Sequence, residues 1–156
     1  MQPADTPAIL IVDDISSIRT VLRHILGTEG FAVYEAGTGR AALQLAQGRS
    51  IDLVLIDAHM PDWDGPQTVR AFREAFPEAP TRYVVMTGDP TTLPETLDVH
   101  HPACLVHRII AKPFRPATLL EFIRQELLLR GASRPTMSGQ APDPAPSVWS
   151  PPVGGV

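Results

Sequence analysis

Four short apolar runs constrain the fold of this chain most strongly, because each is only three to five residues long and each ends at a polar side chain. The runs cover residues 8–12, 53–56, 83–86 and 109–111, and they end at Asp13, Asp57, Thr87 and Lys112. Continuous apolar runs of this kind predict strands buried on both faces, as in a parallel sheet. Ligands of an open α/β sheet bind outside the carboxyl ends of its strands. We therefore expect these polar groups to meet at one edge of the sheet.

The segments between these runs show helical periodicity. Apolar spacing predicts helices over residues 15–26 and 39–47, a third helix from Pro66 that covers Val69 and Phe72, and a last helix that starts near residue 116 and carries Leu127. A further short strand is predicted over residues 31–35. The segment from Gly27 to Gly30 and the glycine at 48 are expected to end the first two helices, and Pro66 suits the first position of the third. Strands that alternate with helices predict right-handed crossovers and a parallel sheet.

Two stretches do not follow this alternation. Prolines at 90, 94 and 102 interrupt residues 88–106, so only a short helix, about 92–99, is expected there. From residue 131 onward proline and glycine dominate and periodicity disappears. We expect one domain over residues 1–130 and a flexible tail over residues 131–156.

Composition limits the compartment and the partners. The 156 residues carry a net charge of −4, which gives no basic surface for nucleic acid. Cys104 is the sole cysteine, so no internal disulfide forms and a reducing compartment fits. We see neither a signal peptide nor an apolar run of membrane-spanning length. The expectation is a cytoplasmic protein without a membrane or nucleic-acid partner.

The polar residues form an ordered set of motifs. Asp13-Asp14, the stretch Asp-Ala-His-Met-Pro-Asp-Trp-Asp-Gly at 57–65, Thr87-Gly88 and Lys112-Pro113-Phe114 occur in this order. Over residues 8 to about 130 the chain resembles the receiver domain of two-component response regulators, of the chemotaxis-receiver type. The resemblance implies a flavodoxin-like, doubly wound sheet of five parallel strands in the order 2-1-3-4-5, with helices on both faces. It also implies a cis peptide bond between Lys112 and Pro113.

The chemistry of these residue types fits phosphoryl transfer. The Asp57 carboxylate is a candidate nucleophile, because a carboxylate can attack phosphorus and form an aspartyl-phosphate. Two further carboxylates repel it, and a hard divalent cation such as Mg²⁺ would offset that repulsion. The resemblance implies that Asp13, Asp14, Asp57 and the backbone carbonyl of His59 hold Mg²⁺. It also implies that Lys112 neutralises charge and that Thr87 hydrogen-bonds the transferred phosphoryl group.

Simpler structural explanations exist for each residue taken singly. Asp14 could cap the following helix, Thr87 could belong to a turn, and Lys112, the sole lysine, could be a solvated charge. The three histidines at 100, 101 and 107 are expected to be solvated loop residues rather than metal ligands, because their spacing matches no metal motif. The ordered set as a whole favours the phosphoacceptor interpretation.

The chain also departs from the family pattern. The family has Tyr or Phe three residues before the lysine, where this chain has Ile109, and residues 88–106 indicate a remodelled fourth helix. These departures support an alternative, a receiver-like interaction module that does not switch on phosphorylation. A third hypothesis is an Mg²⁺-dependent phosphatase of the haloacid-dehalogenase type. That family needs a second aspartate two residues after the nucleophile, where this chain has His59.

The main hypothesis is a single-domain response regulator receiver. A sensor histidine kinase or phosphotransfer protein would donate the phosphoryl group, and the phosphorylated protein would change its affinity for a protein target. Its chemistry would be limited to its own phosphorylation and dephosphorylation, so it is not expected to be an enzyme. The sequence leaves open the kinase, the target, the phosphoryl lifetime, a phosphorylation-dependent homodimer and whether the chain is a fragment.

Overall fold

The computed structural model describes residues 6–93, 97 and 104–132. Five parallel strands form one sheet: β1 (Ala8–Val12), β2 (Ala32–Ala36), β3 (Leu53–Asp57), β4 (Arg82–Thr87) and β5 (Arg108–Ala111). Their order is β2-β1-β3-β4-β5, as the family resemblance implied. The predicted tail over 131–156 lies almost wholly outside the described residues, as does most of the predicted short helix over 92–99.

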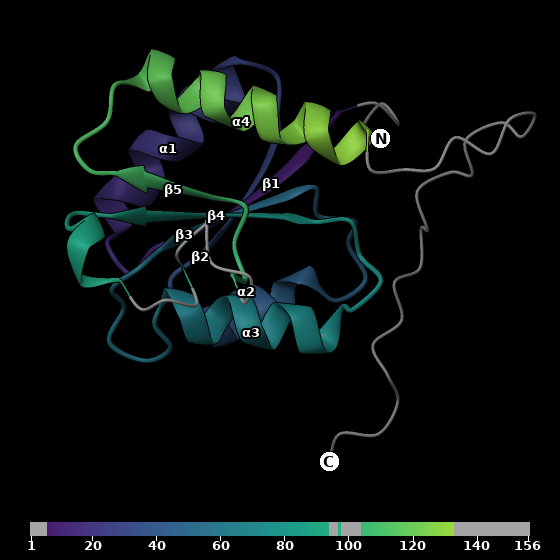
Figure 1. Cartoon of the computed structure of the whole chain (residues 1–156). Helices are drawn as coiled ribbons and strands as arrows, with labels where there is room; N and C mark the ends of the chain where they lie inside the picture. Colours follow the sequence, from purple (N-terminus) through teal and green to yellow (C-terminus); the bar gives the residue numbers. More distant parts are fainter. Residues whose placement is uncertain (1–5, 94–96, 98–103, 133–156) are drawn as a thin grey trace, which may run out of the picture.

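Four α-helices cover the two faces of the sheet. They are α1 (Ser16–Thr28), α2 (Gly39–Ala46), α3 (Gly65–Ala75) and α4 (Pro116–Ala132), and a short 3₁₀ turn, η1, spans Pro90–Thr92. Figure 1 shows α1 and α4 on one face and α2 and α3 on the other. The first helix runs through Gly27, and the chain reverses at Gly30, where φ is +90°. Among the described residues, no helix is both long enough and apolar enough to cross a membrane.

Alternate residues of each strand enter separate cores, because successive side chains of a strand point to opposite faces. Leu10, Val54 and Val85 pack with α2 and α3 in one core. Ile11 and Leu55 pack with α1 and α4 in the other. Burial on both faces explains why the strands are continuous apolar runs.

The start of α3 is fixed to the end of β3. Asp64 is the N-cap and forms a reciprocal capping box with Gln67, so Pro66 occupies the second helical position rather than the predicted first. A Cβ atom on Gly65 would lie only 3.0 Å from the Cα atom of Ala58. Glycine is therefore needed here for close backbone approach, which holds the loop after Asp57 against the sheet.

Ion pairs connect the amino-terminal ends of the strands to α4. Asp52 accepts a hydrogen bond of 2.6 Å from the backbone N–H of Ala8 and pairs with Arg130 near the end of α4. Glu126 of α4 is 2% exposed and pairs with Arg82 of β4 at 2.6 Å and with Arg108 of β5 at 2.8 Å. These ion pairs fix α4 to the amino-terminal ends of the strands.

His107 differs from its prediction as a solvated loop residue. Its Nδ1 atom accepts a hydrogen bond of 2.9 Å from the backbone N–H of Tyr83, and its ring stacks on the Tyr83 ring. Burial, together with the positive charges of Arg82 and Arg73, lowers the pKa of His107 to about 4. The histidine is a structural group at the start of β5. The other two histidines of the predicted set lie outside the described residues.

Candidate functional site

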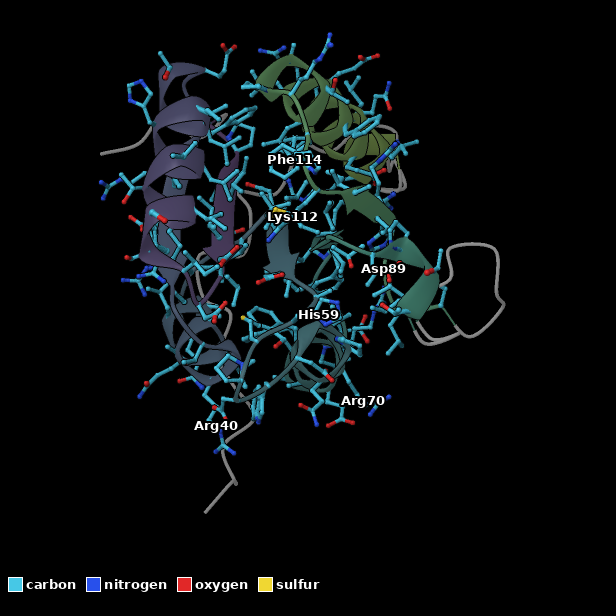
Figure 2. All side chains as sticks on the ribbon, turned by 90° about the vertical axis from the view of Figure 1, so that its left-hand side faces the viewer. Arg40, His59, Arg70, Asp89, Lys112 and Phe114 are labelled. Atoms are coloured by element: carbon cyan, nitrogen blue, oxygen red, sulfur yellow. The ribbon has the colours of Figure 1, made fainter. Side chains whose placement is uncertain are left out.

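The sheet order brings the predicted polar groups to one edge. Asp13, Asp57, Thr87 and Lys112 lie at or just after the carboxyl ends of β1, β3, β4 and β5. Figure 2 looks onto this edge and shows Lys112 and His59 on opposite sides of the strand ends, with Asp89 beside them. Carboxylate oxygens of Asp13, Asp14 and Asp57 lie within 4.8 Å of one another. The three predicted carboxylates therefore form one cluster.

Asp57 lies at the centre of this cluster. It is the last residue of β3 and is 6% exposed. Its Oδ1 atom lies 3.4 Å from the ammonium nitrogen of Lys112 and accepts a hydrogen bond of 3.3 Å from the backbone N–H of His59. The lysine places a positive charge beside this oxygen, where it can offset negative charge at the site.

Asp13 is fully buried beside it. Its Oδ1 atom accepts a hydrogen bond of 2.9 Å from the backbone N–H of Ile15. Burial raises the pKa of Asp13, the hydrogen bond from Ile15 opposes that shift, and the negative charge of Asp57 adds to it. Asp14 is exposed and does not cap α1, because the N-cap position is Ile15, which makes no side-chain cap. The capping explanation for Asp14 is therefore wrong.

The cluster has the donor set that a hard divalent cation requires. Three carboxylates converge, and the Oδ2 atom of Asp13 is buried without a hydrogen-bond donor among the described residues. The ammonium of Lys112 lies 3.5 Å from that oxygen, which is a long ion pair. A buried carboxylate oxygen without a hydrogen bond is unfavourable, and a cation would offset this. The residues present therefore fit Mg²⁺.

Thr87 and Lys112 are held by the backbone around them. The Oγ1 atom of Thr87 accepts a hydrogen bond of 3.1 Å from the backbone N–H of Asp89, so its own O–H remains available to donate. The backbone N–H of Lys112 donates to the carbonyl oxygen of Thr87 at 2.7 Å. The Lys112–Pro113 peptide bond is cis, as expected.

Asp89 is an exposed residue that follows the end of β4 at this edge (Figure 2). Its side chain accepts hydrogen bonds from the hydroxyl and the backbone N–H of Thr91, and these two bonds lower the pKa of Asp89.

Ile109, which occupies the aromatic position of the family, is half-buried against the core beneath α2 and α3. An aliphatic side chain there has no aromatic ring or hydroxyl to present toward the site.

The sequence did not single out Arg19, which contacts the site directly. Its Nη1 atom donates a hydrogen bond of 2.6 Å to the backbone carbonyl oxygen of Asp13. The only indication in the sequence was its place along the chain, since Arg19 is the first basic residue of the helix that follows Asp13-Asp14. Its spacing alone did not say whether the side chain points toward the site or toward solvent.

Comparisons with known proteins agree with this geometry. A model of the response regulator receiver domain matches residues 9–124. The transcriptional regulatory protein SrrA of Staphylococcus aureus is 31% identical over 134 residues, which are 86% of this chain and 52% of SrrA. The chain thus spans about half the length of the curated relatives that it matches.

Solved structures show the same fold. The chemotaxis protein CheY4 of Vibrio cholerae superposes with a TM-score of 0.68 at 32% identity, covering 77% of this chain and 98% of CheY4. A CheY-like receiver domain protein of Methanospirillum hungatei gives a TM-score of 0.74 at 25% identity, covering 83% of this chain and all of that chain. With its five-stranded sheet, its carboxylate cluster and these matches, the chain belongs to the response regulator receiver domain family.

Proposed function

We propose that this domain accepts a phosphoryl group on Asp57 and signals through a changed affinity for another protein. The observation that carries the proposal is the position of the Asp57 carboxylate, buried at the sheet edge between the Lys112 ammonium and the carboxylates of Asp13 and Asp14. A phosphoryl-transfer site needs mainly positioning and charge neutralisation, and this arrangement offers both.

Asp13, Asp14, Asp57 and the backbone carbonyl of His59 would hold Mg²⁺. When bound, the ion neutralises negative charge on the carboxylates and on the phosphoryl oxygens. The buried Oδ2 atom of Asp13 supports this assignment, because among the described residues it accepts no hydrogen bond and its ion pair with Lys112 is long.

The remaining steps belong to residues of the chain. An Asp57 oxygen forms the new bond to phosphorus, while the bond from phosphorus to the donor's nitrogen or oxygen breaks and the donor keeps that electron pair. Lys112 stabilises the added negative charge through its ammonium, which already lies 3.4 Å from Asp57. Among the described residues the hydroxyl proton of Thr87 has no acceptor, so it can be donated to a phosphoryl oxygen.

The proposal extends to partners and location. The donor would be a sensor histidine kinase or a phosphotransfer protein, the receiving target a protein, and the compartment the cytoplasm. Residues 1–130 would form the receiver domain, its chemistry would be self-directed, and a homodimer would be one form that the phosphorylated domain could take. The family assignment removes the support for a haloacid-dehalogenase-type phosphatase.

A second candidate function is an interaction module that does not switch. Ile109 favours it, because the aliphatic side chain replaces the aromatic group that accompanies switching in the family. The complete set of Asp13, Asp57, Thr87 and Lys112 favours the phosphoacceptor.

The test is phosphorylation of the full chain by acetyl phosphate, followed by intact mass. We expect an adduct of one phosphoryl group that depends on Mg²⁺ and is absent from Asp57→Asn. Asp62→Asn is the matched control, since it removes an exposed carboxylate of the same loop that pairs with Arg40. An adduct on Asp57→Asn, or none on a folded wild-type protein that binds Mg²⁺, contradicts the proposal and favours the second candidate.

A further inference from the structure

Arg19 connects the metal-ligand loop to the neighbouring strand. It lies near the start of α1, and its Nη1 atom donates a hydrogen bond of 2.6 Å to the backbone carbonyl oxygen of Asp13. Its Nε atom lies 3.5 Å from the Oε1 atom of Glu35 in β2. The guanidinium thus joins the end of β1 to β2, and its side chain is only 21% exposed.

The carbonyl that Arg19 contacts belongs to the peptide group between Asp13 and Asp14. A peptide group is planar, so fixing its oxygen also fixes its N–H and the direction in which Asp14 continues. Two other polar groups of Asp13 are held as well: its N–H donates to the carbonyl oxygen of Ala36 at 3.2 Å, and its Oδ1 atom accepts from the backbone N–H of Ile15. The arginine fixes the one remaining main-chain group between the two carboxylates.

Gly37 lies beside this guanidinium and, having no side chain, leaves space for it. A Cβ atom on Gly37 would lie 3.3 Å from the Nη1 atom of Arg19, which is closer than an ordinary van der Waals contact. Arginine also suits the position better than lysine would. Its planar group donates in several fixed directions and can meet two acceptors at once, whereas an ammonium acts as a point charge.

We propose that Arg19 is a positioning residue that orients the Asp13-Asp14 pair for binding a divalent cation. This inference rests on the proposed function. The change in cation affinity expected from positioning is opposite in sign to the change expected from the charge of Arg19 alone. A positive charge beside the carboxylates repels a cation, so electrostatics alone predicts tighter binding when Arg19 is neutralised. Positioning predicts weaker binding, because groups that orient metal ligands typically contribute 10- to 100-fold to affinity.

The experiment is a calorimetric titration of the full chain with MgCl₂. Arg19→Gln should raise the Kd for Mg²⁺ by about 10-fold. Arg23→Gln is the matched control, because Arg23 lies on the same helix, carries the same charge and hydrogen-bonds the same Glu35 at 2.9 Å, whereas its partner is not Asp13. This control should stay within about twofold of wild type, since its exposed charge is strongly screened.

A second readout separates positioning from direct participation. The rate of phosphorylation by acetyl phosphate should fall in Arg19→Gln at low MgCl₂ and recover toward the wild-type rate when MgCl₂ saturates the site. A rate that stays low at saturating MgCl₂ contradicts positioning, because it assigns Arg19 a role beyond the metal ligands.

The outcomes distinguish this inference from the proposed function. Wild type that binds no Mg²⁺ overturns the proposed function and this inference with it. Wild type that binds Mg²⁺, with Arg19→Gln at an equal or lower Kd, overturns the inference alone. If Arg19→Gln does not fold, Arg19→Lys keeps the charge and loses the second contact. A Kd for Arg19→Lys within twofold of wild type then overturns positioning.

Discussion

His107 should make the stability of this domain depend on pH. Its imidazole accepts the backbone N–H of Tyr83 through Nδ1, so the neutral ring carries its proton on Nε2. Protonation of Nδ1 would end that hydrogen bond and place a positive charge near Arg82 and Arg73, the two charges that lower its pKa besides burial. Protonation of His107 at acidic pH therefore destabilises the folded state.

The sign and the range follow from the two pKa values. The pKa of His107 is about 4 in the folded protein and 6.5 as its ordinary value. When folding lowers the pKa of a histidine, its contribution to stability is complete at a pH above the pKa of the unfolded state. That contribution is lost as the pH falls through the pKa of the folded state. The difference corresponds to at most about 3.4 kcal/mol. Because the side chain is only half-buried, solvent screening reduces this, and we expect about 1–2 kcal/mol.

The variant that tests this is His107→Asn. Its side-chain carbonyl oxygen can accept the same N–H bond and does not titrate. Urea unfolding at pH 7 and at pH 4.5 should show that wild type loses about 1–2 kcal/mol more than the variant does between these conditions. His24→Asn, which replaces an exposed histidine of α1, should lose as much as wild type. Equal losses for wild type and His107→Asn would refute the reasoning, because all other titrating groups are shared.

Two further predictions concern buried carboxylates. Glu126→Gln should lower the free energy of unfolding by about 2–3 kcal/mol, near the lower end for a broken buried pair, because Arg82 and Arg108 keep some contact with water. Glu121→Gln on the exposed side of α4 should change it little, and an equal loss would contradict the argument. Asp13→Asn should raise the unfolding free energy at pH 7 in EDTA, since burial raises the pKa of Asp13. That gain should shrink as the pH falls toward 3.8, the ordinary carboxyl value, and a constant gain would exclude this cause.

The strands and the candidate site followed closely from the sequence, because burial on both faces leaves a continuous apolar run whose end is easy to read. The sequence pattern alone placed Asp57 and Lys112 at one edge of the sheet, because parallel strands run in the same direction and their carboxyl ends lie at the same edge. Arg19, His107 and Glu126 could not be placed this way. Each owes its position to a partner on another element, and local periodicity does not show whether a charged or aromatic side chain meets one.

The exposed face of α4 shows the same limit. Its apolar residues occur on several sides of the helix, including Leu128, which is 75% exposed. Periodicity therefore could not define a single buried face for this helix. Leu119 and Ile123 of this helix are buried in the core, and the ion pairs of Glu126 with the two strands join residues 44 and 18 positions apart.

The contact of Asp52 with Ala8 and Arg130 has a practical consequence for protein engineering. It brings the start of β1 and the end of α4 to the same edge of the sheet, opposite the edge that holds Asp57 (Figure 1). Domains whose ends lie close together tolerate insertion into a host protein and circular permutation. This domain could therefore be inserted into a surface loop of a fluorescent or enzymatic host. Asp57 would then face away from the junction and stay accessible to a phosphodonor.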